Sequence, residues 1–193
     1  MYADDLLKAP LGFSPDGASL VYRVFGDPTT RADIWILPDP LGMPGASKPS
    51  PFMRTGFNEE YPQFSPDGRW IAYESDESGR FEVYVAPFPG PGAKRQVSTS
   101  GGTRSRWRMD GKELFYRAAD NRLMAAALEA KGGLFEVKTV EPLFEPSAKA
   151  AFADSYDVSA DGQRFLMLVQ VGGDTDRPLT VVQNWIAGIT RGR

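Results

Sequence analysis

One corner motif recurs four times along the chain. The letters FSPDG stand at 13–17 and 64–68, and weaker copies, WRMDG and VSADG, stand at 107–111 and 158–162, so that successive Asp-Gly pairs are 51, 43 and 51 residues apart. In this motif Pro presets the backbone and Gly takes the left-handed conformation that reverses the chain. We therefore expect hairpin corners, with structural turn residues at Asp16, Gly17, Asp67, Gly68, Asp110, Gly111, Asp161 and Gly162.

Short apolar runs accompany each corner in a fixed order. Each run is rich in aromatic and β-branched residues and is bounded by Gly, Pro, Asp or Asn, which is typical of strands. Helix propensity competes only in RLMAAAL at 122–128, and the place of that run in the repeat favours a strand. We expect an innermost strand at each corner, at about 11–14, 61–65, 104–108 and 155–159, and further strands at 19–25, 33–37, 50–53, 69–75, 81–88, 94–98, 112–118, 122–128, 141–145, 163–170 and 178–185.

Four strands in every 40 to 50 residues describe one blade of a β-propeller. The sequence thus predicts an all-β fold: a single β-propeller domain over 1–193, with four-stranded antiparallel blades at roughly 11–53, 61–98, 104–145 and 155–187. Propellers usually close with four to eight blades. Because the fourth unit offers only IAGITRGR as its outer strand, we expect part of a larger ring, with Leu6 and Leu7 as the tail of a missing preceding blade. A self-contained four-bladed ring and assembly from two chains are the alternatives.

The second repeat also resembles a known family. SPDGRWIAYESDESGRFEVYV at 65–85 is similar to the blades of TolB-like, WD-repeat-related propellers, and the resemblance extends over nearly the whole chain. More narrowly, YDVSADGQRFLMLVQ at 156–170 and PLTVVQNWIAGI at 178–189 resemble the C-terminal end of propellers in bacterial proteins whose N-terminal half is often a Ser/Thr protein kinase, although no kinase motif occurs here. The resemblance implies a fold and not a function, because such propellers serve many roles.

The composition excludes several kinds of chemistry. The chain has no histidine and no cysteine, which excludes Ser-His-Asp and Cys-His catalysis, disulfides and most zinc or iron sites within it. With 22 basic against 25 acidic residues, it has no basic field for nucleic acid. We therefore expect no catalytic site, no metal and no cofactor. A secretory signal and a run of 18 apolar residues are both missing, so the chain as given predicts a cytoplasmic protein, or an extracytoplasmic one if it belongs to a longer membrane-anchored polypeptide.

Three arginines occupy the innermost strand of the third repeat. Arg104, Arg106 and Arg108 alternate along the strand, so they are expected to share the face that lines the central channel. Guanidinium groups at a channel mouth are suited to a phosphate, a carboxylate or an acidic peptide. The alternative is that the arginines pair with acids of the neighbouring blades, namely Glu59, Glu60 and Asp154. The two adjacent glutamates are not expected to form a glycosidase pair, because adjacent strand residues point to opposite faces.

The other distinctive segments are interpreted as connections or core. Acid-rich loops at 26–33 and 75–80 lack the spacing of an EF-hand and are expected to be solvated. The proline-rich segments 38–45 and 87–92 fall where the chain has to reverse. The four tryptophans are expected mainly in the core between blades: Trp35, Trp70, Trp107 and Trp185.

These features predict a non-catalytic interaction or sensor module that binds a protein or a small anionic ligand through its loops and channel mouth. Its partner would be another protein or the missing propeller blades. The alternative is a C-terminal regulatory or extracytoplasmic propeller segment of a larger enzyme, such as a Ser/Thr protein kinase or, less favoured, a prolyl-oligopeptidase-like peptidase.

Overall fold

The computed structural model describes residues 6–43, 45, 47–90, 92–131, 133–146, 156–168 and 179–183. These residues form fifteen strands, and no helix occurs among them. They fall into two compact units, Met1–Ser105 and Arg106–Arg193. The part of the chain described here therefore holds nothing helical that could cross a membrane.

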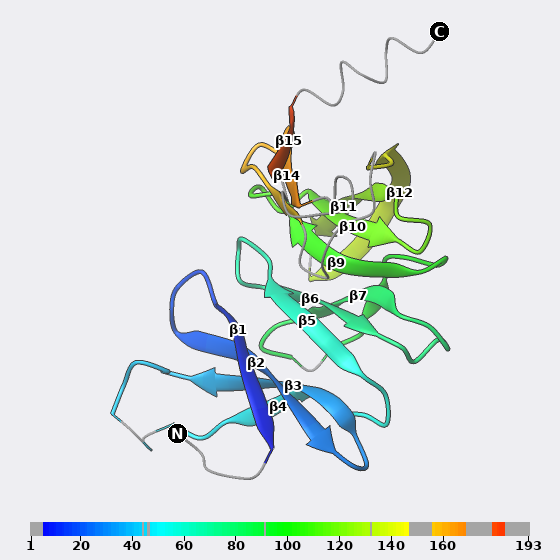
Figure 1. Ribbon diagram of the computed structural model, residues 1–193. Helices are drawn as coiled ribbons and strands as arrows, with labels where there is room; N and C mark the ends of the chain where they lie inside the picture. The colour runs from blue at the N-terminus through cyan, green and yellow to red at the C-terminus, as the bar shows by residue number, and fades with distance from the viewer. Residues whose placement is uncertain are drawn as a thin grey trace, which may run out of the picture. The chain divides into compact units, whose positions relative to one another are not determined.

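The first unit contains two four-stranded antiparallel sheets, and in each the strands follow sequence order (Figure 1). The first sheet consists of β1 (Leu7–Phe13), β2 (Ser19–Asp27), β3 (Arg31–Pro38) and β4 (Ser50–Met53). The second consists of β5 (Glu59–Phe64), β6 (Trp70–Ser75), β7 (Glu82–Pro87) and β8 (Arg95–Gln96).

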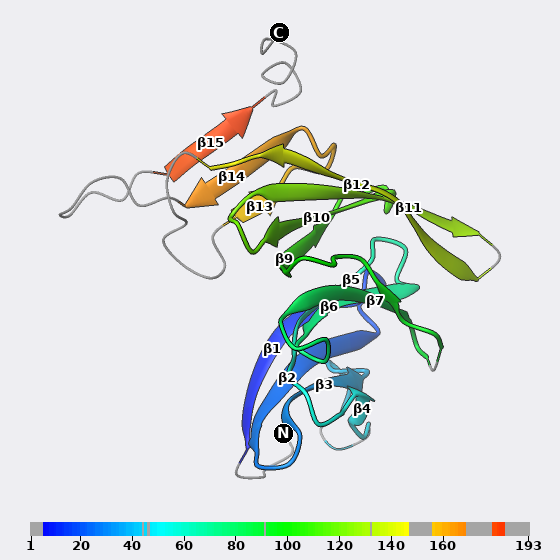
Figure 2. The same cartoon turned by 90° about the vertical axis from the view of Figure 1, so that its right-hand side faces the viewer.

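The third sheet repeats this order, and its first strand crosses the boundary between the units. It consists of β9 (Gly102–Trp107), β10 (Glu113–Ala118), β11 (Leu123–Lys131) and β12 (Leu134–Phe144), of which the last two form a long hairpin (Figure 2). The fourth sheet has three described strands: β13 (Tyr156–Val158), β14 (Arg164–Leu168) and β15 (Leu179–Gln183). The expected outer strand at IAGITRGR lies outside the described residues. The all-β prediction of antiparallel blades is thus confirmed.

Two strand-level predictions had different outcomes. The alanine-rich run at 122–128 is a strand, as its place in the repeat indicated, because β11 pairs on both sides with β10 and β12. The interpretation of Leu6 and Leu7 as the tail of another blade was wrong: Leu7 begins β1 and pairs with Phe25. A register shift between Pro10 and Gly12 allows β1 to pair with β2 from Leu7 to Phe13. The sequence predicted only about 11–14 as a strand, because residues 7–10 do not form an apolar run.

Three of the four corners share one hydrogen-bond pattern, made by the Ser that precedes the Asp by two residues. Ser65 donates its hydroxyl to Asp67 at 2.6 Å and accepts the Trp70 backbone N–H at 3.0 Å, while the Gly68 N–H bonds to the Ser65 carbonyl at 2.9 Å. Ser14 and Ser159 make the same bonds in their corners. The four glycines have φ between 70° and 73°, the left-handed region that suits glycine: Gly17, Gly68, Gly111 and Gly162.

Each unit has its own apolar core between two sheets. In the first unit the buried members are Val21, Ile34, Ile36, Ile71, Tyr73, Tyr84 and Ala86. In the second unit they are Phe115, Leu123, Leu143, Tyr156, Phe165 and Met167. Trp70 and Trp107 are buried and Trp35 is half-buried, whereas Trp185 lies outside the described residues.

Candidate functional site

Two innermost strands adopt left-handed backbone at equivalent positions. Tyr61 in β5 has φ 49° and Arg104 in β9 has φ 57°, and each lies six residues before the Asp of its corner, Asp67 or Asp110. Such a conformation is rare for residues other than glycine and is often found at functional sites. In β5 it coincides with a register shift between Glu60 and Gln63, which redirects the side chains there.

Tyr61 and Arg104 meet Arg23 of β2 in an arginine–tyrosine cluster, formed by Arg23, Tyr61 and Arg104. The guanidinium carbon of Arg104 lies 3.2 Å from the centroid of the Tyr61 ring. The guanidinium carbon of Arg23, on β2, lies 5.0 Å from the same centroid and 4.8 Å from that of Phe25. Both distances fall within the range of a cation–π interaction. Strands β2 and β5 and the part of β9 that belongs to the first unit thus bring two cations to one aromatic ring.

Two carboxylates balance the charge of this cluster. Glu60 accepts a hydrogen bond from Nη1 of Arg23 at 2.7 Å, and the two side chains are 24% and 18% exposed. Glu74 is buried and accepts the backbone N–H of Arg104. Nε of Arg23 is buried and has no hydrogen-bond partner among the described residues. The cluster is therefore held in place from several elements, and its side chains remain partly open to solvent.

The three arginines singled out in the sequence have different surroundings. Arg104 belongs to the arginine–tyrosine cluster, and its left-handed backbone interrupts the alternation from which a shared face was inferred. Arg106 lies 5.7 Å from the ring centroid of Tyr156. Arg108 forms ion pairs with Asp110 and Glu113 at 2.7 Å, both in its own hairpin. Arg108 occupies the corner position held elsewhere by Ser, which explains why its partners are local.

The adjacent glutamates Glu59 and Glu60 lie in unlike surroundings. Glu59 is 1% exposed and accepts a hydrogen bond from the Thr55 hydroxyl, while its second oxygen has no partner among the described residues. Burial, with a smaller effect of the nearby Asp33 carboxylate, raises the pKa of Glu59 to about 7. The expected loop at 26–33 was wrong for Asp33, which is buried in β3, where burial raises its pKa too.

Sequence reasoning missed Arg23 and Tyr61. Tyr61 was recoverable, because it occupies the same place in the repeat as Arg104. No sequence feature distinguished Arg23, because its contact with Tyr61 depends on the packing of β2 beside β5. Among the described residues, no three carboxylates gather as a metal site would require.

Comparisons with known proteins identify the fold. No protein-family model and no curated protein matches the chain. Among solved structures, TolB from Acinetobacter baumannii is 21% identical, with a TM-score of 0.66 over 93% of this chain and 41% of that one. An oligogalacturonate lyase in complex with manganese is 15% identical, with a TM-score of 0.62 over 91% and 48%. The Cps50 (Swd1) β-propeller domain of Myceliophthora thermophila is 10% identical, with a TM-score of 0.59 over 87% and 53%.

These likenesses concern the fold, since propellers with quite different activities share it. The chain spans about half or less of the length of each of these proteins. The corner motif, the antiparallel sheets and the structural matches lead to the same conclusion: the described sheets have the fold of blades of a TolB-like, WD-repeat-type β-propeller.

Proposed function

We propose that the chain is a non-catalytic interaction module that binds an acidic group of a partner protein, or a small anion of the same chemistry, at the arginine–tyrosine cluster. The observation that carries this proposal is the placement of two guanidinium groups against the half-buried ring of Tyr61. A guanidinium presents several N–H donors in a fixed plane, which suits carboxylate and phosphate oxygens.

The local backbone supports a binding role. Two residues other than glycine hold left-handed conformations on neighbouring inner strands, at a cost of about 1–3 kcal/mol each. Glu60 holds the guanidinium of Arg23, and Glu74 holds the backbone N–H of Arg104. An anionic ligand at the cluster competes with Glu60 for the donors of Arg23.

The test is isothermal titration calorimetry with two probes, citrate and a hexaglutamate peptide. Wild type should bind at least one of them. Arg104→Gln should weaken that binding about tenfold or more, because a hydrogen bond to a charged group contributes roughly 1.5–3 kcal/mol. Arg95→Gln is the matched control: Arg95 lies on β8 of the same unit, is exposed, and should leave binding unchanged.

Circular dichroism establishes that the variants are folded. Absence of binding by wild type, or equal binding by wild type and Arg104→Gln, contradicts the proposal. Hydrolytic or transferase activity of the purified chain that disappears on replacing one of its own carboxylates contradicts its non-catalytic part.

The second candidate is a propeller segment of a larger enzyme, such as a Ser/Thr protein kinase. It is supported by the resemblance of 156–170 and 178–189 to kinase-associated propellers. Kinase motifs in the coding sequence upstream of Met1 are the expected observation, and further blades alone would argue against it.

A further inference from the structure

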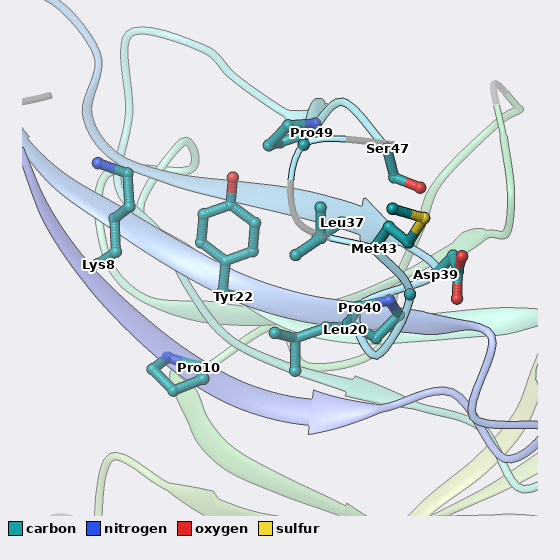
Figure 3. Close-up of a pocket in the computed structure, with 12 residues that line it drawn as sticks. Lys8, Pro10, Leu20, Tyr22, Leu37, Asp39, Pro40, Met43, Ser47 and Pro49 are labelled. Carbon is teal, nitrogen blue, oxygen red and sulfur yellow. The ribbon is translucent and has the colours of Figure 1, made fainter. Parts of the chain in front are cut away.

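Strand β3 is mostly apolar, but a buried carboxylate lies near its beginning. Towards the end of the strand, Leu37 lines an apolar cavity of about 410 Å³ together with Leu20 and Tyr22 of β2, as Figure 3 shows. Near the beginning, Asp33 is 2% exposed, and its Oδ2 accepts the Thr30 hydroxyl at 2.7 Å. Its other oxygen, Oδ1, is buried and has no hydrogen-bond partner among the described residues. Asp33 is therefore a buried acid with one unsatisfied oxygen.

The chain passes the beginning of β3 on its way from the first sheet to the second. An isolated parallel bridge pairs Ala32 with Asn58, and the residues that follow them are Asp33 and Glu59. Glu59 is 1% exposed, and its Oε2 is also buried without a partner in the described part of the chain. Burial raises the pKa of Glu59, and the Asp33 carboxylate contributes to the shift because the two charges repel each other. Two neighbouring carboxyl groups thus each have one unsatisfied oxygen.

The passage from the second sheet to the third shows how the repeat fills this place elsewhere. Glu82 of β7 stands where β3 has Asp33, because each pairs with the residue eight places after its own corner Asp. Gly102 stands in the place of Glu59, since each lies eight residues before the next corner Asp. The second passage therefore has one carboxyl group where the first has two.

The single carboxylate of the second passage is fully hydrogen-bonded. Glu82 is 1% exposed, and its Oε2 accepts the Ser98 hydroxyl. Its Oε1 accepts the Gly101 N–H at 2.8 Å and Nε of Arg80 at 2.9 Å. One acid with several donors is thus sufficient for such a passage, and Glu59 is an additional buried acid that the repeat does not require.

The charges around Asp33 and Glu59 do not replace the missing donors. Arg54 lies 3.8 Å from Asp33 but 3.1 Å from Asp27, and its side chain is 46% exposed, so that solvent screens its attraction. The charged or titratable side chains that act on the two acids, or on the bridge beside them, are Asp27 of β2, Arg31 of β3, Arg54 of the β4–β5 connection, Tyr73 of β6, Asp76 after β6, and Lys94 of the β7–β8 connection.

The two acids are the groups suited to titrate near neutral pH. The chain has no histidine, the side chain that usually does so. Burial raises the pKa of Asp33 as well as that of Glu59. By contrast, hydrogen bonds from the backbone of Thr29 and Thr30 lower the pKa of Asp27, and burial raises that of the Tyr73 hydroxyl. Neither of these neighbours therefore changes its charge between pH 6 and pH 8.

We propose that Asp33 and Glu59 form a pH-sensitive latch, which is closed while the two acids share a proton and loosens the beginning of β5 when both are charged. A bound proton turns one carboxylate into a donor for the other, whereas two buried negative charges repel each other. Glu60 and Tyr61 follow Glu59 directly on β5. Opening of the latch should therefore weaken anion binding at the arginine–tyrosine cluster as pH rises. This regulation rests on the proposed function, whereas the latch itself does not.

The latch is tested on the full chain without ligand. Infrared difference spectra between pH 6 and pH 8.5 should show the C=O band of a protonated carboxyl group at the lower pH. Glu59→Gln should abolish this band, whereas Glu129→Gln, at a side chain 52% exposed, should retain it. Hydrogen exchange at the amides of 58–61 should be about tenfold faster at pH 8.5 than the intrinsic chemical rate accounts for, and Glu59→Gln should remove the excess. A wild type without the band, or without the excess exchange, would overturn the latch.

The regulation is tested by calorimetric titration with hexaglutamate, whose carboxylates remain ionised between pH 6 and pH 8. Wild type should bind about fivefold or more weakly at pH 8 than at pH 6, and Glu59→Gln should bind equally at both. Wild-type binding that does not vary with pH would contradict the regulation alone. Absence of binding at both pH values would contradict the proposed function and the regulation with it, while the infrared and exchange measurements still decide the latch.

Discussion

Glu59 combines full burial with an ionisable group. Glu59 is 1% exposed, and its carboxyl accepts a hydrogen bond from the Thr55 hydroxyl. Burial raises its pKa from 4.5 to about 7, so the folded state holds the proton more tightly than the unfolded chain does. Between pH 4.5 and about pH 7 the folded state binds more protons than the unfolded chain does. The contribution of Glu59 to the free energy of unfolding therefore falls as the pH rises through this range.

Replacing this carboxyl should remove that pH dependence. Glu59→Gln is expected to raise the free energy of unfolding relative to wild type by up to about 3 kcal/mol at pH 8, and by little at pH 4.5, because one pKa unit corresponds to about 1.4 kcal/mol. Urea unfolding at a series of pH values measures the difference. Glu129→Gln, at a side chain that is 52% exposed and paired with Lys138, is the surface control and should change the free energy of unfolding by less than about 1 kcal/mol. A difference between Glu59→Gln and wild type that does not vary with pH would contradict the raised pKa.

At the level of elements, the four corners differ in what surrounds their glycines. A Cβ at Gly111, with φ 72°, would meet nothing within 4 Å. A Cβ at Gly162, with φ 73°, would lie 2.7 Å from Cδ of Arg108 and 3.2 Å from Cζ of the buried Phe115. Arg108 is held by Asp110 and Glu113 and has little freedom to move aside.

A matched pair of substitutions separates backbone strain from crowding. Gly111→Ala should lower the free energy of unfolding by about 1 kcal/mol, the cost of a left-handed residue with a Cβ. Gly162→Ala should cost about 1–3 kcal/mol more, since crowding adds to the same strain. Urea unfolding of both variants provides the measurement. Equal decreases in the free energy of unfolding would contradict the prediction, because they would show that Arg108 and Phe115 move aside at no energetic cost.

The order of strands was predictable from sequence, because turn chemistry and apolar runs are local properties. The strand at 122–128 illustrates this, because its place in the repeat predicted a strand correctly although its alanines favour a helix. The left-handed residues Tyr61 and Arg104 were not predictable, because neither residue type favours that conformation on its own. The arginine–tyrosine cluster was therefore only one-third visible in the sequence: Arg104 was named, whereas Tyr61 and Arg23 required the fold.

For the molecule as a whole, the two described cores share no residue. Ile71→Val in the first core should lower the free energy of unfolding by about 0.5–1.5 kcal/mol, and Leu123→Ala in the second by about 2–5 kcal/mol. If the cores are energetically independent, the double variant should show the sum of the two losses within about 0.5 kcal/mol. Urea unfolding with a single fitted slope tests this, and a clear departure from additivity would show that the cores are coupled.

The packing of one blade on the next was the part least accessible from sequence. Corner motifs indicate the number of repeats, yet which apolar face of a blade meets a neighbour depends on strand alternation within packed sheets. Val21 and Tyr22 show the difficulty: they are adjacent, and only the structure shows that Val21 is the one that packs in the core with the second sheet.

The shared backbone conformation of Tyr61 and Arg104 also bears on how such a protein acquires new specificity. Because the left-handed conformation occurs with two chemically unrelated side chains, it does not depend on which of the two the position carries. The second and third repeats thus each provide a display position on the inner strand, whereas the first repeat has Pro10 in that place. Selection, or a designer, can vary residues 61 and 104 while the blades themselves stay the same.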